Sequence, residues 1–225
     1  KKNNLLMSIF IQIGACVGDQ DPKTNFKDGF TSFIKGSKNF KDSRIILIEA
    51  NPTNIDALKK CWADYKYSEI YNVGLVPDNV DNDYLDFYYS EKDQPYYLSA
   101  SFDINHVIKS FPNDKILNKK IKVEKINNFF DQNIKDQEVS YLAIDAEGLD
   151  LKLLINLDLN KFNIKNISIE VIHLSKKEKR QLIKKMIENG YSFCGKGFDH
   201  QGFDYMFTRK LNFFLKLKTK LISLL

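Results

Sequence analysis

Short apolar runs alternate with longer stretches of helical periodicity along most of the chain, and this alternation restricts the fold more than any other feature. The run RIILIE at residues 44–49 is apolar almost throughout, which is typical of a strand covered on both faces. Helices between successive strands favour parallel βαβ units. The sequence therefore predicts an α/β fold with a mostly parallel central sheet and flanking helices.

The elements follow from this pattern. Strands of the central sheet are predicted over residues 8–13, 44–49, 69–73, 139–145 and 167–171. Helices are predicted over residues 29–38, 149–156 and 176–189 and after the turn at residues 51–54. Final strands at 191–194 and 204–208 close the sheet as a hairpin with an antiparallel C-terminal edge. The irregular middle segment is predicted to hold strands at 84–89 and 121–124 and a helix at 105–109.

The composition indicates a folded protein that needs no disulfides: 43% of the 225 residues are hydrophobic and 28% are charged. The three cysteines are scattered, which favours a reducing compartment. The net charge of +5 comes from lysines spread along the chain, so we expect no nucleic-acid partner. No apolar run reaches the roughly 20 residues of a membrane span, and residues 1–8 lack a signal cleavage site. We therefore expect a cytoplasmic protein.

Two features at the ends of predicted strands indicate a nucleoside ligand. Gly14 and Gly18 follow the first strand, where glycine lets the backbone pass close to a ligand at the carboxyl edge of the sheet. Glu49 ends the next strand, and its carboxylate can accept hydrogen bonds from both ribose hydroxyls. A glycine turn beside an unrelated acid is the alternative. Because Cys16 replaces the second glycine of the dinucleotide pattern and no Walker pattern is present, a ligand without phosphates fits better.

Four motifs in a fixed order make the chain resemble the FkbM-type methyltransferase family between about residues 9 and 209. The motifs are Gln12-Ile13-Gly14-Ala15-Cys16-Val17-Gly18, Glu49-Ala50-Asn51-Pro52, Asp145-Ala146-Glu147-Gly148 and Ile169-Glu170. This chain departs from the family's usual residues at Gln12, Cys16, Ala50 and Asp150. The resemblance implies a Rossmann-like class I methyltransferase sheet, S-adenosylmethionine as the methyl donor, and O-methylation of a saccharide or similar small polar acceptor, as in capsule or surface glycan modification.

The resemblance also implies which residues bind the donor. Gly14, Ala15 and Gly18 would approach its amino-acid end, and Glu49 its ribose. Asn72, Val73 and Gly74 would lie at the adenine. The remaining residues of the expected donor site are Gln12, Cys16, Ala50, Asn51 and Asp145.

Asp145, Glu147 and His173 are the catalytic candidates. Methyl transfer is first a problem of alignment and then of proton removal. Asp145 and Glu147 follow a central strand, where either could hold the acceptor hydroxyl or take its proton, or both could cap the next helix. His173 follows the next strand and could act as a base or make only a structural hydrogen bond. Asp145, Glu170 and His173 could bind Mg²⁺, but their spacing does not single out a metal site and none is predicted.

The middle segment carries hydroxyl and aromatic side chains that could line an acceptor pocket, namely Tyr96, Tyr97, Ser99 and Ser101. Filling a core is the commoner role of aromatic residues, so that alternative stays open. This segment would select the acceptor.

We expect residues 1–210 to form one methyltransferase domain and residues 211–225 an amphipathic C-terminal helix, because apolar residues recur there at helical spacing between lysines. Such a helix could pack on its own domain, on the partner in a homodimer or on a membrane surface. Two alternatives to a methyltransferase are a non-catalytic nucleoside-binding or accessory module and an NAD-dependent oxidoreductase, the latter disfavoured by the missing glycine pattern.

Overall fold

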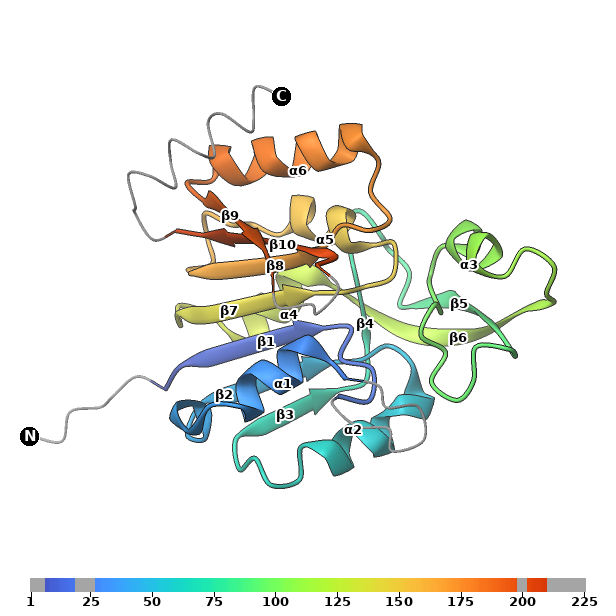
Figure 1. Ribbon diagram of the computed structural model, residues 1–225, viewed down its shortest axis with the longest axis horizontal. Helices are drawn as coiled ribbons and strands as arrows, with labels where there is room; N and C mark the ends of the chain where they lie inside the picture. The colour runs from blue at the N-terminus through green and yellow to red at the C-terminus, as the bar shows by residue number, and fades with distance from the viewer. Residues whose placement is uncertain (1–6, 19–26, 198–201, 210–225) are drawn as a thin grey trace, which may run out of the picture.

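Apolar strands pair into a seven-stranded sheet in the part of the chain that the computed structural model describes, residues 7–18, 27–197 and 202–209 (Figure 1). Across the sheet the order is β3 (Ser68–Tyr71), β2 (Arg44–Ile48), β1 (Ile9–Ile13), β7 (Val139–Ile144), β8 (Asn166–Glu170), β10 (Asp204–Thr208) and β9 (Ser192–Lys196). The first five strands run parallel, whereas β10 is antiparallel to both of its neighbours. The predicted mixed sheet with antiparallel C-terminal strands is confirmed. The antiparallel strand itself lies one place in from the edge, which β9 forms.

Alternate residues of the parallel strands enter separate cores on the two faces of the sheet. Ile9, Ile11 and Ile13 pack with residues of α4 (Ile126–Asn133), α5 (Asp150–Asn156) and α6 (Lys176–Glu188). Phe10 packs on the opposite face with residues of α1 (Gly29–Lys35) and α2 (Ile55–Cys61). Because both faces are covered, β1, β2 and β7 are apolar at nearly every position, and a shift of one residue would place each side chain in the wrong core.

Polar side chains cap the first turns of α1 and α6. Asp28 accepts a hydrogen bond from the Thr31 amide at the start of α1, and Ser175 forms a capping box with Glu178 at the start of α6. The helix predicted over 29–38 is split, because α1 ends at Lys35 and a short 3₁₀ helix, η1 (Lys38–Phe40), follows. A second one, η2 (Pro52–Asn54), precedes α2.

A smaller three-stranded sheet stands beside the main one and, with α3 (Ile104–Ser110), projects from it as a lobe (Figure 1). Its order is β4 (Gly74–Val76), β6 (Ile116–Lys125) and β5 (Tyr84–Ser90), with β6 parallel to β4 and antiparallel to β5. The sequence predicted β5 and α3 but only part of β6, and it missed α4. The strand predicted over 69–73 ends at Tyr71, because the chain leaves the main sheet there and enters the smaller one at Gly74.

One prediction falls outside the described residues, namely the C-terminal helix at 211–225. Within the ranges that are described, no helix has the length and apolar character needed to cross a bilayer.

Candidate active site

A cavity of about 360 Å³ lies at the carboxyl ends of β1, β2 and β7. Open α/β sheets bind ligands at this edge, where turns rather than side-chain layers form the surface. Gly14, Glu49 and Asp145 all line the cavity. The glycine turn and the carboxylate that the sequence indicated as a nucleoside site, Gly14 and Glu49, therefore border one cleft. Val73 and Gly74 line it as well.

The turn after β1 packs directly against the tip of β7. Gly14 has φ +82°, and a Cβ atom added to it would lie 1.6 Å from the carbonyl oxygen of Asp145. The Gly14 amide donates to the Ile48 carbonyl at 2.9 Å, which ties the same turn to β2. Only glycine can occupy this position, because the backbone conformation and the lack of space both exclude a side chain.

The carboxylate of Glu49 is held in the wall between β1 and β2. One oxygen accepts from the Asn51 amide and the other from the Cys16 amide, each at 2.7 Å. The residue is only 6% exposed, and burial raises the pKa of Glu49 to about 7 in spite of these bonds. The side chain of Asn54 also contributes a hydrogen bond that acts to lower the pKa of this carboxylate. A carboxylate has about four acceptor positions, so acceptor capacity remains for a ligand's hydroxyl group.

Two residues that the sequence did not single out support this wall. Asn54 is buried and donates through Nδ2 to the Tyr96 carbonyl at 3.1 Å, which anchors the loop that precedes α3. Lys119, on β6, donates to Oδ1 of Asn51 at 2.6 Å, and its positive charge acts to lower the pKa of Glu49. Asn54 belongs to a visible turn motif, whereas no local signal marks Lys119.

Asp145 projects into the cavity, where solvent reaches its carboxylate although protein atoms surround it. Burial, followed by the negative charges of Glu170 and Glu147, raises the pKa of Asp145 well above its usual range. Asp145 and Glu147 do not cap the next helix, because α5 has Leu149 at its N-cap without any side-chain cap bond.

Asp150 instead holds the turn that carries these two acids. Its carboxylate accepts from the amides of Ala146 at 2.6 Å and Gly148 at 3.0 Å. The side chain is buried, and burial raises the pKa of Asp150 to about 6.

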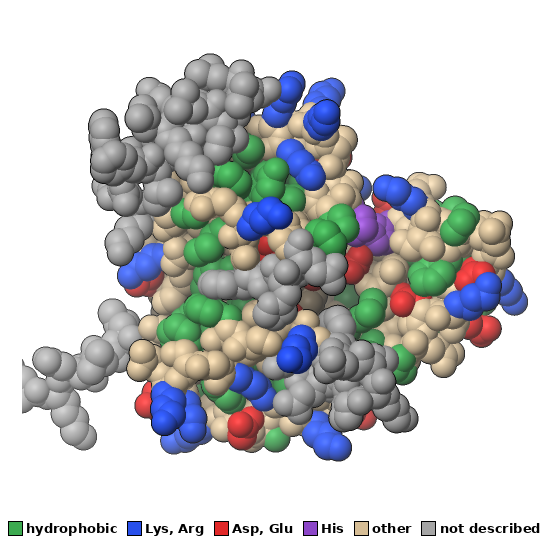
Figure 2. Space-filling view, viewed as in Figure 1, with side chains coloured by type: hydrophobic (Ala, Val, Ile, Leu, Met, Phe, Trp, Pro, Cys, Tyr) green, Lys and Arg blue, Asp and Glu red, His purple; other side chains and the backbone are tan. Residues whose placement is uncertain are grey.

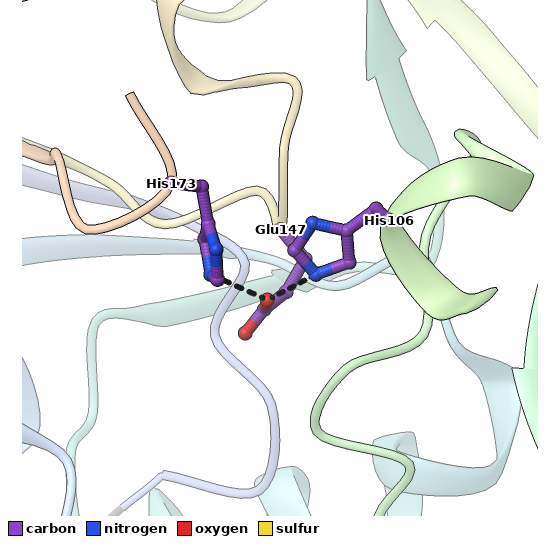
Figure 3. A group of neighbouring side chains, drawn as sticks. All are labelled: His106, Glu147 and His173. Atoms are coloured by element: carbon purple, nitrogen blue, oxygen red, sulfur yellow. Dashed lines mark hydrogen bonds and ion pairs between the residues drawn. The ribbon is translucent and has the colours of Figure 1, made fainter. Parts of the chain in front are cut away.

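Glu147 meets two histidines from other elements (Figure 3). Its Oε2 lies 3.0 Å from Nε2 of His106, which α3 carries, and 3.7 Å from Nε2 of His173, which follows β8. Glu170 Oε2 lies 3.6 Å from the same atom of His173. The sequence grouped Asp145 with Glu170 and His173. The structure places Glu170 beside this histidine, but it groups the carboxylate of Asp145 with those of Asp150 and Glu170, and it brings His106 and Glu147 to His173.

Several predicted site residues do not line the cavity. Gln12 is 3% exposed and its amide donates to Asp28 at 2.9 Å, so it faces the start of α1. Ala15 is buried between the sheet and α1, and Gly18 packs against Cys61 of α2. Asn72 is exposed and its amide donates to the backbone of Glu49 at 2.9 Å, which braces the wall from outside.

Of the remaining predicted residues, some line the cavity and others do not. Cys16, Ala50 and Asn51 line the cavity, as does Tyr97 of the middle segment. Tyr96, Ser99 and Ser101 do not, and Ser101 instead donates through Oγ to the Glu147 carbonyl at 2.6 Å.

Comparison with known proteins gives a family match over most of the chain. Residues 12–193 match the methyltransferase FkbM domain. No curated protein is significantly similar in sequence.

Several solved structures are similar to the chain at low identity. The fibrillarin pre-rRNA processing protein of Methanococcus jannaschii is 10% identical, covering 90% of this chain and 66% of that chain, with a TM-score of 0.45. The methyltransferase domain of METTL16 is 8% identical, covering 94% and 76%, with a TM-score of 0.47. Aeropyrum pernix fibrillarin, solved with S-adenosyl-L-methionine, is 11% identical, covering 90% and 65%, with a TM-score of 0.40. The chain thus spans about two thirds of the length of each fibrillarin.

The family match, the sheet order and the cavity at the carboxyl edge agree with one another. The chain belongs to the FkbM family of S-adenosylmethionine-dependent methyltransferases.

Proposed function

We propose that the cavity binds S-adenosylmethionine between Gly14 and Glu49, and that the enzyme transfers the methyl group to a hydroxyl of a saccharide or similar small polar acceptor. The observation that carries this proposal is the position of a buried carboxylate opposite a glycine turn on one cavity wall. The acceptor capacity that remains on Glu49 suits a hydroxyl group of a ribose. The absence of a phosphate-binding glycine pattern suits a nucleoside without phosphates.

The walls on either side of Glu49 fit the two ends of this donor. Beside the proposed ribose position, Val73 and Gly74 form an apolar edge, and a Cβ atom on Gly74 would lie 2.4 Å from Cζ of Phe102. The close packing of Phe102 on this glycine leaves a flat apolar surface, which suits an adenine ring. The donor's amino-acid end would then lie toward Gly14 and Asp145.

The proposed acceptor side combines apolar and acidic groups. Phe87, Tyr97 and Leu98 line the cavity across from the carboxylates of Asp145 and Glu147. Aromatic rings pack against the apolar faces of sugar rings, while carboxylates bind their hydroxyl groups. This combination supports a saccharide acceptor, such as a capsule or surface glycan.

Asp145 is the group that we place at the reacting hydroxyl, because this acid lines the cavity and its backbone packs against Gly14. When bound, the donor supplies an activated methyl group on a sulfonium. The carboxylate can orient the hydroxyl for in-line approach and accept its proton. Glu147 can hold a second hydroxyl, and His173 acts on the site through its contact with Glu147.

The experiment combines ligand binding with turnover. Calorimetry should show S-adenosylhomocysteine binding and no NAD binding, and labelled donor should methylate at least one member of a panel of nucleotide sugars and glycans. Binding of NAD in place of S-adenosylhomocysteine would contradict the donor assignment. Methylation of amine acceptors alone, with hydroxyl acceptors inert, would contradict O-methylation while leaving the donor site intact.

A further inference from the structure

We propose that His106, Glu147 and His173 bind one divalent transition-metal ion, such as Zn²⁺, at the side of the cavity that faces the smaller sheet. The three side chains come from α3, from the turn after β7 and from the segment after β8, and their polar ends point toward one another (Figure 3). Figure 2 shows histidine and acidic side chains together at the junction between the main body and the lobe.

The ligand atoms have the spacing that a small cation requires. Zinc binds imidazole nitrogen and carboxylate oxygen at about 2.0–2.2 Å, which places neighbouring ligand atoms roughly 3.0–3.5 Å apart. Glu147 Oε2 lies 3.0 Å from His106 Nε2 and 3.7 Å from His173 Nε2. One ligand atom from each of the three residues lies within 4.8 Å of the others. An ion could therefore be bound with shifts of side chains alone.

The ligand set favours a transition metal over Mg²⁺ or Ca²⁺. Neutral imidazole suits Zn²⁺, Fe²⁺, Co²⁺ and Ni²⁺, whereas the two hard ions prefer oxygen ligands. Glu170 Oε2, at 3.6 Å from His173 Nε2, offers a further carboxylate beside the three ligands.

The surrounding structure holds these ligands in place. Ser101 donates to the Glu147 carbonyl at 2.6 Å, which links the turn to the lobe. A Cβ atom on Gly148 would lie 3.0 Å from Nδ1 of His106, so a glycine here gives the imidazole room beside Glu147. The His106 side chain is 8% exposed, while those of Glu147 and His173 are 29% and 31% exposed, which leaves an approach from solvent.

Negative charge near the site also favours a cation. Asp145 experiences the charges of Glu170, Glu147, Asp150 and Asp204. Carboxylates that crowd one another in a partly buried region are stabilised by a bound cation. This site goes beyond the proposed function, because metal binding requires neither the donor nor the acceptor. An ion on Glu147 would nevertheless border the cavity and could bind an acceptor hydroxyl.

The test measures metal binding directly. The full chain, stripped with a chelator, is titrated with Zn²⁺ by calorimetry, and with Co²⁺ by visible absorption, which reports nitrogen and oxygen ligands. His106→Gln, His173→Gln and Glu147→Gln should each weaken binding at least about tenfold. Glu138→Gln is the matched control, because Glu138 pairs with Lys165 at the opposite end of β7 and should leave binding unchanged. Thermal melts confirm that each variant is folded.

Binding of one Zn²⁺ or Co²⁺ per chain that is lost in the three ligand variants, with S-adenosylhomocysteine binding retained in His106→Gln, would support the site. No binding to the wild type, or binding that these substitutions leave unchanged, would overturn it. Equal affinity for Mg²⁺ would overturn the assignment to a transition metal. Because S-adenosylhomocysteine binding is measured separately, loss of the metal site and loss of the proposed donor site give different results.

Discussion

Acidification from pH 8 to pH 6 should weaken the binding of S-adenosylhomocysteine about tenfold through protonation of Glu49. The pKa of this residue is raised to about 7, first of all by burial. If only the ionised form of Glu49 accepts hydrogen bonds from the ribose hydroxyls, protonation raises the apparent dissociation constant. The factor is one plus the ratio of protonated to ionised Glu49. That factor is about 11 at pH 6 and about 1.1 at pH 8, which gives the tenfold change.

The assay is calorimetry across this pH range with wild type and Glu49→Gln. At pH 8 the variant should bind about 10- to 150-fold more weakly, because hydrogen bonds to a charged group contribute about 1.5–3 kcal/mol. Its affinity should also lose the dependence on pH near 7. A wild-type affinity that stays constant between pH 6 and 8, or a variant that keeps the same slope, would refute the assignment of Glu49 to the ribose.

A pair of lysine variants makes the same test sharper. Lys119 lowers the pKa of Glu49, so Lys119→Met should move the midpoint of the binding curve to higher pH. Lys120 is adjacent in sequence but pairs with Asp86 at 2.9 Å on the exposed side of the smaller sheet, so Lys120→Met should leave the midpoint in place. Equal shifts in both variants would show that net charge, rather than the contact near Glu49, sets the pH dependence.

Further predictions concern stability and turnover. Gly14→Ala should lower the free energy of unfolding in urea by more than about 3 kcal/mol. Gly190 has a nearly identical φ of +81° but nothing within 4 Å of an added Cβ atom, so Gly190→Ala should lower it by only about 1–2 kcal/mol. Equal losses would mean that backbone strain alone, and not the lack of space at Gly14, sets the cost. Asp145→Asn should lower turnover about 100-fold or more while raising the melting temperature, because repulsion from neighbouring carboxylates is relieved; unchanged turnover would remove its catalytic role. The raised pKa of Glu49 means that its contribution to stability is complete below the unfolded-state pKa of 4.5 and is lost as the pH rises through about 7. The free energy of unfolding should fall by about 3 kcal/mol over this range. Urea melts at a series of pH values measure it, and a Glu49→Gln variant whose free energy of unfolding depends on pH as the wild type's does would contradict the prediction.

The parts of the fold that could be predicted are those in which one physical requirement controls a whole segment. β1, β2 and β7 are buried on both faces, so nearly every residue in them is apolar and the pattern is plain. β6 is different, because its alternating lysines and apolar residues face solvent on one side. Only residues 121–124, in its C-terminal half, were predicted. The helix α4 follows it without a side-chain cap, so no polar residue marked its start.

The residues of the candidate site likewise fall into those that the sequence could bring together and those that it could not. Gly14 and Glu49 could be brought together from the sequence because they end adjacent parallel strands, and the pairing of β1 with β2 then fixes their separation. His106 could not, because it lies 41 residues from Glu147 and meets it only through the packing of α3 beside the main sheet. Lys119 is likewise 68 residues from Asn51. Contacts between the lobe and the main sheet join residues far apart in the sequence, so no hydrophobic periodicity in either segment indicates them.

This division suggests how the two halves of the enzyme cooperate. The wall proposed to bind the donor is built from turns of the main sheet, whereas the aromatic wall belongs to the lobe. Glu147 contacts residues of the lobe and follows a strand of the main sheet. Its backbone carbonyl accepts from Ser101 and its carboxylate contacts His106, so two lobe residues set the position of an acid carried by β7. A ligand that moves the lobe would therefore move Glu147 relative to Asp145, which the turn after β1 holds against Gly14. Under the proposed function, acceptor binding and the alignment of the reacting hydroxyl would be coupled through this one residue.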